Sequence, residues 1–423
     1  MAQATRPAGF YRHNDGHHDA LVCDGVPLAA IAAAEGTPLY VYSAAVLRER
    51  YLAIDGAFQG YPHALHYALK ANSTLAIARL LRELGSSVDA NSVWEIEVAR
   101  RAGFAPSQIV FTGVGKTPAE LAQAIDLNVK TINAESEGEL ERIDLLARER
   151  QTRARVALRV NPDIDARSHP HISTGLKANK FGIAMDAVRE ICRRASRRDG
   201  LEIVGLHTHV GSQITDLDPL RRAAVAVVTL ARELVDDGIR IDHLDLGGGL
   251  GVSYDGSKVP TADEYAAALL PAVKDSGLAI ILEPGRNIVA PAGALLSRVV
   301  DVKDRPDGKV FVILDAGMSE LIRPMLYGAY HRIEAAETTS APNIVADIVG
   351  PLCESSDTLG KDRRLPRPRP GDLFAVLDAG AYGAVMASNY NRRPMPAEVL
   401  VDGAKWAVIR RRQTIDDLLA LES

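Results

Sequence analysis

Cysteine is scarce in this sequence: there are three in 423 residues, and aromatic side chains make up only 5% of the chain. Cys23, Cys192 and Cys353 have no regular spacing, which excludes a disulfide framework and is typical of a reducing compartment. Long hydrophobic runs are missing too; segment 223–231 is among the longest, far short of the ~20 residues that cross a bilayer. The N-terminus lacks the apolar stretch of a signal peptide. We therefore expect a cytoplasmic protein without a membrane partner.

An excess of positive charge is also missing. Lys and Arg number 49 and Asp and Glu 54, so the formal net charge is −5. This balance does not attract a polyanion, and we expect no nucleic-acid partner. The basic, Pro-rich run KDRRLPRPRPGD at 361–372 is accordingly interpreted as a solvated loop between strands. With 47% hydrophobic and 24% charged residues, the composition is that of a folded globular protein of two or three domains.

A β/α pattern repeats eight times between residues 60 and 290. Each apolar, strand-like run is followed by a polar or Gly-containing turn and a segment with helical periodicity, often opening with Ser or Thr. The runs cover residues 63–69, 86–90, 109–112, 129–133, 155–160, 201–208, 241–246 and 277–282. Eight such units in about 250 residues predict a (β/α)₈ TIM barrel. We place it at residues 36–290.

The pattern changes after residue 284. Short strand-like runs such as KVFVILDAG, NIVADIVG and KWAVIRRRQ are separated by Gly, Pro and Asp turns, which predicts an all-β domain. The strand-like pieces HDALVCDG and PLYVYSA indicate that the N-terminus returns to it. The expected fold is therefore α/β: a TIM barrel plus a discontinuous β-barrel or sandwich domain at 1–35 and 291–423.

Chemically active residues gather where the barrel strands are expected to end, which is where TIM barrels carry their active sites. Lys70 follows the first strand, Asp89 and Glu95 the second, Glu135 the fourth and Glu283 the eighth. A lysine at such a mouth is a candidate Schiff-base former.

Glycines after the late strands predict an anion site. Gly247, Gly248 and Gly249 let the backbone approach a ligand, and the Gly211-Ser212 and Gly285-Arg286 pairs add a hydroxyl and a guanidinium, so we expect a phosphate there. A phosphate site with a lysine fits either a Schiff-base aldolase of sugar phosphates or a pyridoxal-phosphate enzyme. Glu283 favours the second, because a carboxylate can keep a pyridine nitrogen protonated.

His207 and His209 share one face of a strand and could be read as a metal pair. No third ligand stands at a supporting spacing, so we expect no metal and a stacking role for His209 on the cofactor ring. His13, His17 and His18 lie in a polar terminal stretch and are expected to be solvated.

Taken together, the motifs resemble those of the fold type III pyridoxal-phosphate decarboxylases. They are YALKAN, RVNPDIDARSHPHISTGLKANKFGI, HTHVGSQ, DLGGGLGVSY, EPGR, DAGMSELIRPMLYGAYH, GPLCESSD and AGAYG, and they cover nearly the whole chain. Within the family they are most similar to the branch that converts meso-2,6-diaminopimelate to L-lysine and CO₂, the last step of lysine synthesis by that route. The resemblance implies a carboxy-lyase with pyridoxal 5'-phosphate as cofactor and a small amino acid as substrate.

The resemblance also implies residue roles. Lys70 carries the cofactor as a Schiff base with Asp89 and Glu95 nearby, His209 stacks on the ring, and Glu283 pairs with the ring nitrogen. The remaining cofactor-binding residues are Ser212, Gly247, Gly248, Gly249, Pro284, Gly285, Arg286 and Tyr382. Arg286, Arg323, Tyr327 and Tyr382 hold the substrate carboxylate, and Glu354 its distal ammonium group. Cys353 is the proton donor, and the partner chain's CES loop and AGAY tyrosine complete each site of a homodimer.

Several departures and alternatives remain. The usual Ser-Gly-Gly-Glu reads Ser92-Val93-Trp94-Glu95 here, so Trp94 could narrow the lysine pocket; FTGVGK and Ser319 also depart from the family pattern. The alternatives are a sister decarboxylase acting on ornithine, arginine or a carboxylated polyamine, a non-catalytic pyridoxal-phosphate-binding homologue, and an alanine-racemase-like enzyme.

Overall fold

The structure, a computed structural model, describes residues 9–14, 19–165, 175 and 179–422. The chain divides into two compact units. The barrel unit consists of Arg50–Gly251 and Val259–Gly285, and the sheet unit of Met1–Glu49, Val252–Lys258 and Arg286–Ser423. His17, His18 and much of the segment 159–183 quoted above lie outside the described residues. In the described part of the chain, no helix is long and apolar enough to cross a membrane.

The barrel unit is a closed ring of eight parallel strands, as the sequence predicts. In order around the ring they are β5, β6, β7, β8, β9, β11, β12 and β13; β8 pairs with β9 and β13 with β5. Their bounds are His63–Ala68, Ser87–Ala90, Ile109–Phe111, Thr131–Ala134, Ala154–Asn161, Leu201–His207, His243–Asp245 and Ala279–Leu282. A short extra strand, β10 (Ile183–Ala184), pairs with β9. All the strand carboxyl ends therefore meet at one mouth.

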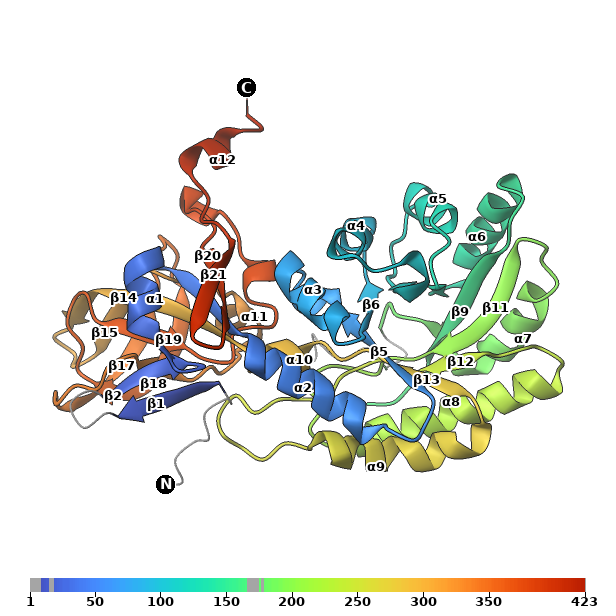
Figure 1. Cartoon of the computed structure of the whole chain (residues 1–423), viewed down its shortest axis with the longest axis horizontal. Coiled ribbons are helices and arrows are strands. Elements are labelled where there is room, and N and C mark those ends of the chain that lie inside the picture. The colour runs from blue at the N-terminus through green and yellow to red at the C-terminus, as the bar shows by residue number, and fades with distance from the viewer. Residues whose placement is uncertain (1–8, 15–18, 166–174, 176–178, 423) are drawn as a thin grey trace. The chain divides into compact units, whose positions relative to one another are not determined.

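Helices follow the barrel strands, and Figure 1 shows α8 and α9 running side by side along one flank. The helices are α3 (Leu75–Glu83), α4 (Val93–Ala102), α5 (Pro118–Asp126), α6 (Glu137–Glu149), α7 (Met185–Ala195), α8 (Asp218–Asp236) and α9 (Ala262–Val273). Their starts follow the expected capping chemistry: the hydroxyls of Ser92, Thr117, Ser136 and Thr261 accept backbone N–H groups of the first turn. These hydroxyl caps set the residue at which each of the four helices begins.

The sheet unit combines the two ends of the chain. Its larger sheet runs β18-β17-β15-β14-β4-β20-β21, with β19 paired to β14 and to β16, and its smaller sheet is β1-β2-β3. The strands are β1 (Phe10–Asn14), β2 (Asp19–Cys23), β3 (Val26–Pro27), β4 (Leu39–Ser43), β14 (Gly293–Asp304), β15 (Val310–Leu314), β16 (Ile333–Ala335), β17 (Asn343–Val349), β18 (Thr358–Pro366), β19 (Leu373–Val376), β20 (Ala397–Asp402) and β21 (Lys405–Arg410). Short helices α1 (Leu28–Glu35), α10 (Arg286–Val289), α11 (Arg323–Tyr327) and α12 (Ile415–Leu419) connect them.

These units differ from the domain boundaries expected at residues 36 and 290. β4 pairs antiparallel with β14 and parallel with β20, so the piece PLYVYSA is part of the large sheet, as the sequence indicates. Helix α2 (Ala44–Ala57) carries the chain from one unit to the other. Leu39 and Val41 of β4 are fully buried in the same apolar core as Leu296 and Val399. This shared core is the physical reason that the boundary lies later in the chain.

Candidate functional site

Lys70 lies in the barrel mouth, in a single 3₁₀ turn (Leu69–Ala71) directly after β5. Its Nζ donates to Oδ2 of Asp89 on β6 at 2.9 Å, and the amide of Asn91 donates to both Asp89 oxygens at 3.2 Å. Asp89 is fully buried, whereas the Lys70 side chain is 34% exposed. A buried, fixed carboxylate thus holds an accessible amine at the end of its strand.

Glu95, on helix α4, stabilises the turn that contains Asn91. Its Oε2 accepts the Asn91 N–H at 2.7 Å, and the Ser92 hydroxyl accepts the Glu95 N–H at 3.1 Å. Burial raises the pKa of Glu95, against the lowering effect of the Asn91 N–H. The neighbouring Trp94 is 79% exposed, so its indole is not packed into the lysine pocket as the sequence had suggested it could be.

The glycines after β11, β12 and β13 bring three loops into backbone contact. A Cβ on Gly248 would lie 2.1 Å from the Glu283 carbonyl oxygen, and one on Gly249 2.5 Å from that of Gly211. Gly247 and Gly249 also have φ of +67° and +110°. Gly285 packs against the first loop, since a Cβ there would meet those of Ala68 and Ala71 at 3.1 Å. The three loops that were expected to form a phosphate site therefore do converge.

His209 is held against this glycine turn. Its Nδ1 accepts the Gly248 N–H at 3.1 Å, and burial, with Lys70 as the next cause, lowers its pKa to about 3. The ring is therefore neutral near pH 7. The nearby His207 lies beside Glu283, with Nε2 3.4 Å from Oε2. Asp245 adjoins them both, a residue that stands in the DLGGG motif but that sequence reasoning left without a role.

Glu135 is used structurally. It accepts Arg159 Nη1 at 2.6 Å and the Gly182 N–H at 2.8 Å, and Lys116 donates to Glu139 at 2.6 Å. All four side chains of these two ion pairs are nearly fully buried. Buried pairs of this kind satisfy their own charges, so this side of the mouth offers paired groups and not a reactive one.

Two arginines of the sheet unit share one tyrosine. Arg286 Nη1 donates to the Tyr254 hydroxyl at 2.9 Å and its guanidinium lies 4.8 Å from the Tyr382 ring centroid. The guanidinium of Arg323 lies 4.7 Å from the Tyr254 ring centroid. Sequence reasoning missed Tyr254, although it closes the quoted motif DLGGGLGVSY. Two buried cations on one tyrosine form a cluster suited to a carboxylate.

His331, also missed, fixes the direction of Arg323. Its Nδ1 lies 2.9 Å from the Leu377 carbonyl oxygen and its Nε2 2.7 Å from Arg323 Nη1. Burial, followed by the Arg323 charge, lowers the pKa of His331 to about 3, so the ring is neutral. It must then donate from Nδ1 to the carbonyl and accept from the guanidinium at Nε2. The RPMLYGAYH motif held the signal, since His331 follows Arg323 by eight residues.

Tyr327, Cys353 and Glu354 lie at the surface of the sheet unit. Tyr327 ends α11 and is half-buried. Cys353 and Glu354 are exposed in the loop between β17 and β18, outside the buried arginine cluster. Asn391 accepts the Cys353 N–H at 3.2 Å, and Glu354 Oε1 accepts the N–H and hydroxyl of Ser356 at 3.2 and 3.1 Å. The loop presents a thiol and a carboxylate outward.

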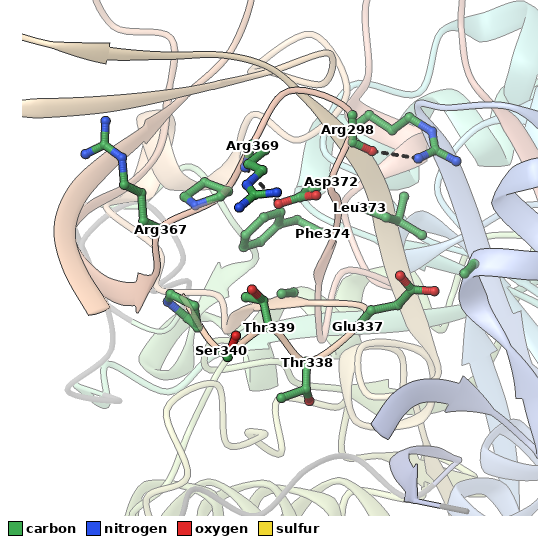
Figure 2. A pocket seen from close by; sticks show the side chains of 15 residues that line it. Arg298, Glu337, Thr338, Thr339, Ser340, Arg367, Arg369, Asp372, Leu373 and Phe374 are labelled. Atoms are coloured by element: carbon green, nitrogen blue, oxygen red, sulfur yellow. Dashed lines mark hydrogen bonds between the residues drawn. The ribbon is translucent and has the colours of Figure 1, made fainter. Parts of the chain in front are cut away.

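The basic, Pro-rich run is only partly a loop. Its first half belongs to β18, and the remainder forms the turn to β19, which lines a cavity of about 450 Å³ (Figure 2). Arg298 donates to the Gly371 carbonyl at 2.7 Å, and Arg367 forms an ion pair with Asp304. Asp372 accepts the Arg369 N–H at 2.8 Å. Local acids and carbonyls thus take up much of the positive charge around this cavity.

Comparisons with known proteins identify the family to which this chain is similar. Residues 44–290 match the family "Pyridoxal-dependent decarboxylase, pyridoxal binding domain". Diaminopimelate decarboxylase of Pseudomonas aeruginosa is 46% identical over 403 residues, which are 95% of this chain and 97% of that protein. The crystal structure of the Helicobacter pylori enzyme complexed with L-lysine has a TM-score of 0.90 and 43% identity, covering 93% of this chain and 98% of that one.

A lysine/ornithine decarboxylase structure from Vibrio vulnificus, with a TM-score of 0.79 but 24% identity, is similar in fold. Likeness to the diaminopimelate enzymes is stronger and extends through both units. The chain belongs to the diaminopimelate decarboxylases, a group of the pyridoxal-dependent decarboxylases.

Proposed function

We propose that the protein is a pyridoxal-phosphate-dependent carboxy-lyase that converts meso-2,6-diaminopimelate to L-lysine and CO₂. The observation that carries the proposal is the near-full-length likeness to proteins named diaminopimelate decarboxylase, one of them solved in complex with L-lysine. The distantly related lysine/ornithine decarboxylase supports a common fold only.

The barrel mouth fits pyridoxal phosphate. Glu283 Oε1 is a buried oxygen without a hydrogen-bond donor among the described residues, as the acceptor for a pyridine N–H would be. The glycine loops leave no room for a Cβ, as a phosphate held by backbone N–H groups requires. Lys70 would bind the aldehyde carbon of the cofactor, and His209 would stack on the face of its ring. The phosphate group would be bound by Gly247 to Gly249, Ser212 and Gly285. When bound, the cofactor supplies a conjugated ring that accepts the electron pair of the broken Cα–carboxylate bond.

The substrate tail would be read by the sheet unit. Diaminopimelate carries a distal carboxylate and a distal ammonium group, and a selective site needs fixed opposite charges for both. The distal carboxylate would be bound by Arg323, whose guanidinium is oriented by His331, together with Arg286, Tyr327 and Tyr382. Glu354 would bind the distal ammonium group. Arg323 and Arg286 are already desolvated, which favours a buried carboxylate partner over water.

Cys353 would deliver the proton. When CO₂ leaves, the Cα must receive a proton, which we assign to the Cys353 S–H; the thiolate left behind then takes a proton from solvent. Of the three cysteines, which the structure describes in full, only Cys353 is exposed. Because an exposed loop carries Cys353 and Glu354, we propose that they complete the site of a second copy in a homodimer. The reducing cytoplasm, which we propose as its location, would keep this thiol free.

A substrate panel tests the proposal. Purified protein with pyridoxal phosphate should release CO₂ from meso-diaminopimelate and not from ornithine, arginine or a carboxylated polyamine, and Lys70→Ala should lose both turnover and the visible absorption of bound cofactor. The exposed Lys303→Ala serves as the matched control. Release of CO₂ from another substrate alone, or exchange of the Cα proton without CO₂, would assign the chain to a sister decarboxylase or a racemase instead.

A further inference from the structure

Three buried ionisable side chains meet at the end of neighbouring barrel strands. His207 ends β11 and Asp245 ends β12, where the two residues are register partners, and Glu283 follows β13. One nitrogen of His207 and one oxygen from each acid lie within 4.8 Å of one another. None of the three is more than 4% exposed. Sequence reasoning gave Glu283 a role and left Asp245 without one.

One oxygen of each acid lacks a hydrogen-bond donor among the described residues. Asp245 Oδ1 accepts the Gly247 N–H at 2.9 Å, but its Oδ2 is buried and has no donor among the described residues. Glu283 Oε1 is in the same position, while its Oε2 faces His207. Two carboxylates this close in a dry site cannot both stay ionised at ordinary cost. A proton on one of them allows an O–H···O hydrogen bond between the two acids.

The surrounding charges decide which acid carries that proton. Burial raises the pKa of both, but His207 and then Lys70 act on Glu283 and bring its pKa below the ordinary value. For Asp245, burial, the Glu283 charge and Asp89 raise the pKa well above the ordinary value. His66, Lys130 and Tyr265 are the other titratable groups whose charge couples to this pair. The proton therefore belongs to Asp245.

We propose that Asp245 is a positioning residue: as a neutral acid it donates a hydrogen bond from Oδ2 to Glu283, holding that carboxylate as an anion aimed at the pyridine nitrogen. Its role toward the ring rests on the proposed function, whereas the hydrogen-bonded pair does not. The neutral acid orients Glu283 without adding a second negative charge beside the ring. The backbone N–H of Gly247 anchors Asp245, so the same glycine turn that would hold the phosphate also aligns the acid.

His207, Asp245 and Glu283 are also close enough together to bind a divalent cation. That alternative predicts the opposite protonation state for Asp245. A metal ion needs both acids deprotonated, because it binds the carboxylate and not the carboxylic acid. An amide at position 245 separates the two cases. Asp245→Asn keeps an Oδ1 acceptor for Gly247 and offers an N–H₂ donor to Glu283, whereas Asp245→Ala removes both.

The first measurement is an infrared spectrum of the apo-protein near pH 7. The wild type should show the C=O stretch of a buried protonated carboxylic acid, and Asp245→Asn should lack that band. Asp242→Asn, three residues earlier and half-buried beside Arg155, is the matched control and should keep it. This readout needs neither cofactor nor turnover.

The second measurement is the pyridoxal-phosphate dissociation constant, from absorbance titration of the apo-proteins. Asp245→Asn should bind within about threefold of wild type, and Asp245→Ala about tenfold or more weakly, as loss of a charge-assisted hydrogen bond implies. If the alanine variant does not fold, the infrared comparison of wild type with Asp245→Asn still decides.

Three results would overturn the proposal: no acid band in the wild type, an Asn variant that binds as weakly as the Ala variant, or stoichiometric divalent metal that is lost in the Asn variant. A wild type that shows the band but binds no pyridoxal phosphate would overturn the proposed function and the role toward the ring, and leave the hydrogen-bonded pair standing. The two failures are thus distinguishable.

Discussion

Cys353 differs from the other two cysteines in its surroundings. Cys23 and Cys192 are buried, and burial raises the pKa of the Cys192 thiol to about 12, so neither exchanges protons readily near pH 7. We predict that Cys353→Ala lowers kcat for CO₂ release by about 10²- to 10⁴-fold, the usual contribution of a general acid, while cofactor absorbance is unchanged. Cys192→Ala should keep the wild-type kcat. A Cys353→Ala enzyme with wild-type turnover would show that another group supplies the proton.

Arg323 should contribute to the binding of both diaminopimelate and its product. L-Lysine has lost the carboxylate of the reacting carbon but keeps the distal one, so Arg323→Met should lower kcat/KM for diaminopimelate by about 10- to 100-fold, mostly through KM, the loss expected for a hydrogen bond to a charged group. The inhibition constant of L-lysine should rise by a similar factor, and steady-state kinetics with added lysine measure both. A weakened substrate with an unchanged inhibition constant of L-lysine would contradict the assignment of Arg323 to the distal carboxylate.

Single residues mark the limit of sequence reasoning at this site. Lys70 and Glu283 were readable because a lysine and an acid directly follow apolar strands. Tyr254, His331 and Asp245 were not, because their importance comes from contacts between segments: His331 with Leu377 and Asp245 with Glu283. A pattern along the chain reports which side chains leave a strand end, but not which of them will share a proton or a cation.

At the scale of elements, the glycine loop after β12 tolerates no side chain. A Cβ at Gly248 would collide with the backbone carbonyl of Glu283, which cannot move without displacing the end of β13. Gly248→Ala should therefore lower the free energy of unfolding by about 1–3 kcal/mol and weaken pyridoxal-phosphate binding. Urea unfolding and cofactor titration measure the two effects.

Gly115, in the loop after β7, is the matched control for this substitution. It has nothing within 4 Å of an added Cβ, so Gly115→Ala should change stability by no more than about 0.5 kcal/mol. If Gly248→Ala and Gly115→Ala have the same free energy of unfolding and the same affinity for pyridoxal phosphate, the loop after β12 does tolerate a side chain and the prediction is wrong.

The eight barrel strands were predictable because each buried parallel strand is a short apolar run bounded by turns, as in VALRV before Asn161. The piece PLYVYSA was also assigned to the β domain, but the boundary expected at residue 36 precedes it. The pairing of β4 with β14 and β20, more than 240 residues away in sequence, moves that boundary later in the chain. Periodicity identifies a strand; long-range pairing decides its sheet.

At the scale of the whole molecule, buried neutral histidines predict acid sensitivity in both units. Burial is the first cause that lowers the pKa of His66 to about 3 and His243 to about 4 in the barrel unit, and of His331 to about 3 in the sheet unit. In the unfolded chain a histidine titrates near 6.5. Between these values the unfolded state binds more protons than the folded state. Stability is therefore complete above about pH 6.5 and is lost as pH falls toward 3.

Urea unfolding of the apo-protein at pH 7, 6 and 5 should show this loss as a falling midpoint in the circular dichroism signal. Each of the three histidines contributes about 1–2 kcal/mol by pH 5, since one pKa unit is 1.36 kcal/mol. His243→Gln should flatten the dependence by one such share, because glutamine takes up no proton, whereas the exposed His13→Gln should leave the wild-type slope. A midpoint that is independent of pH from 7 to 5 would mean that these histidines are not neutral in the folded protein. His331 would then be unable to accept a hydrogen bond from Arg323.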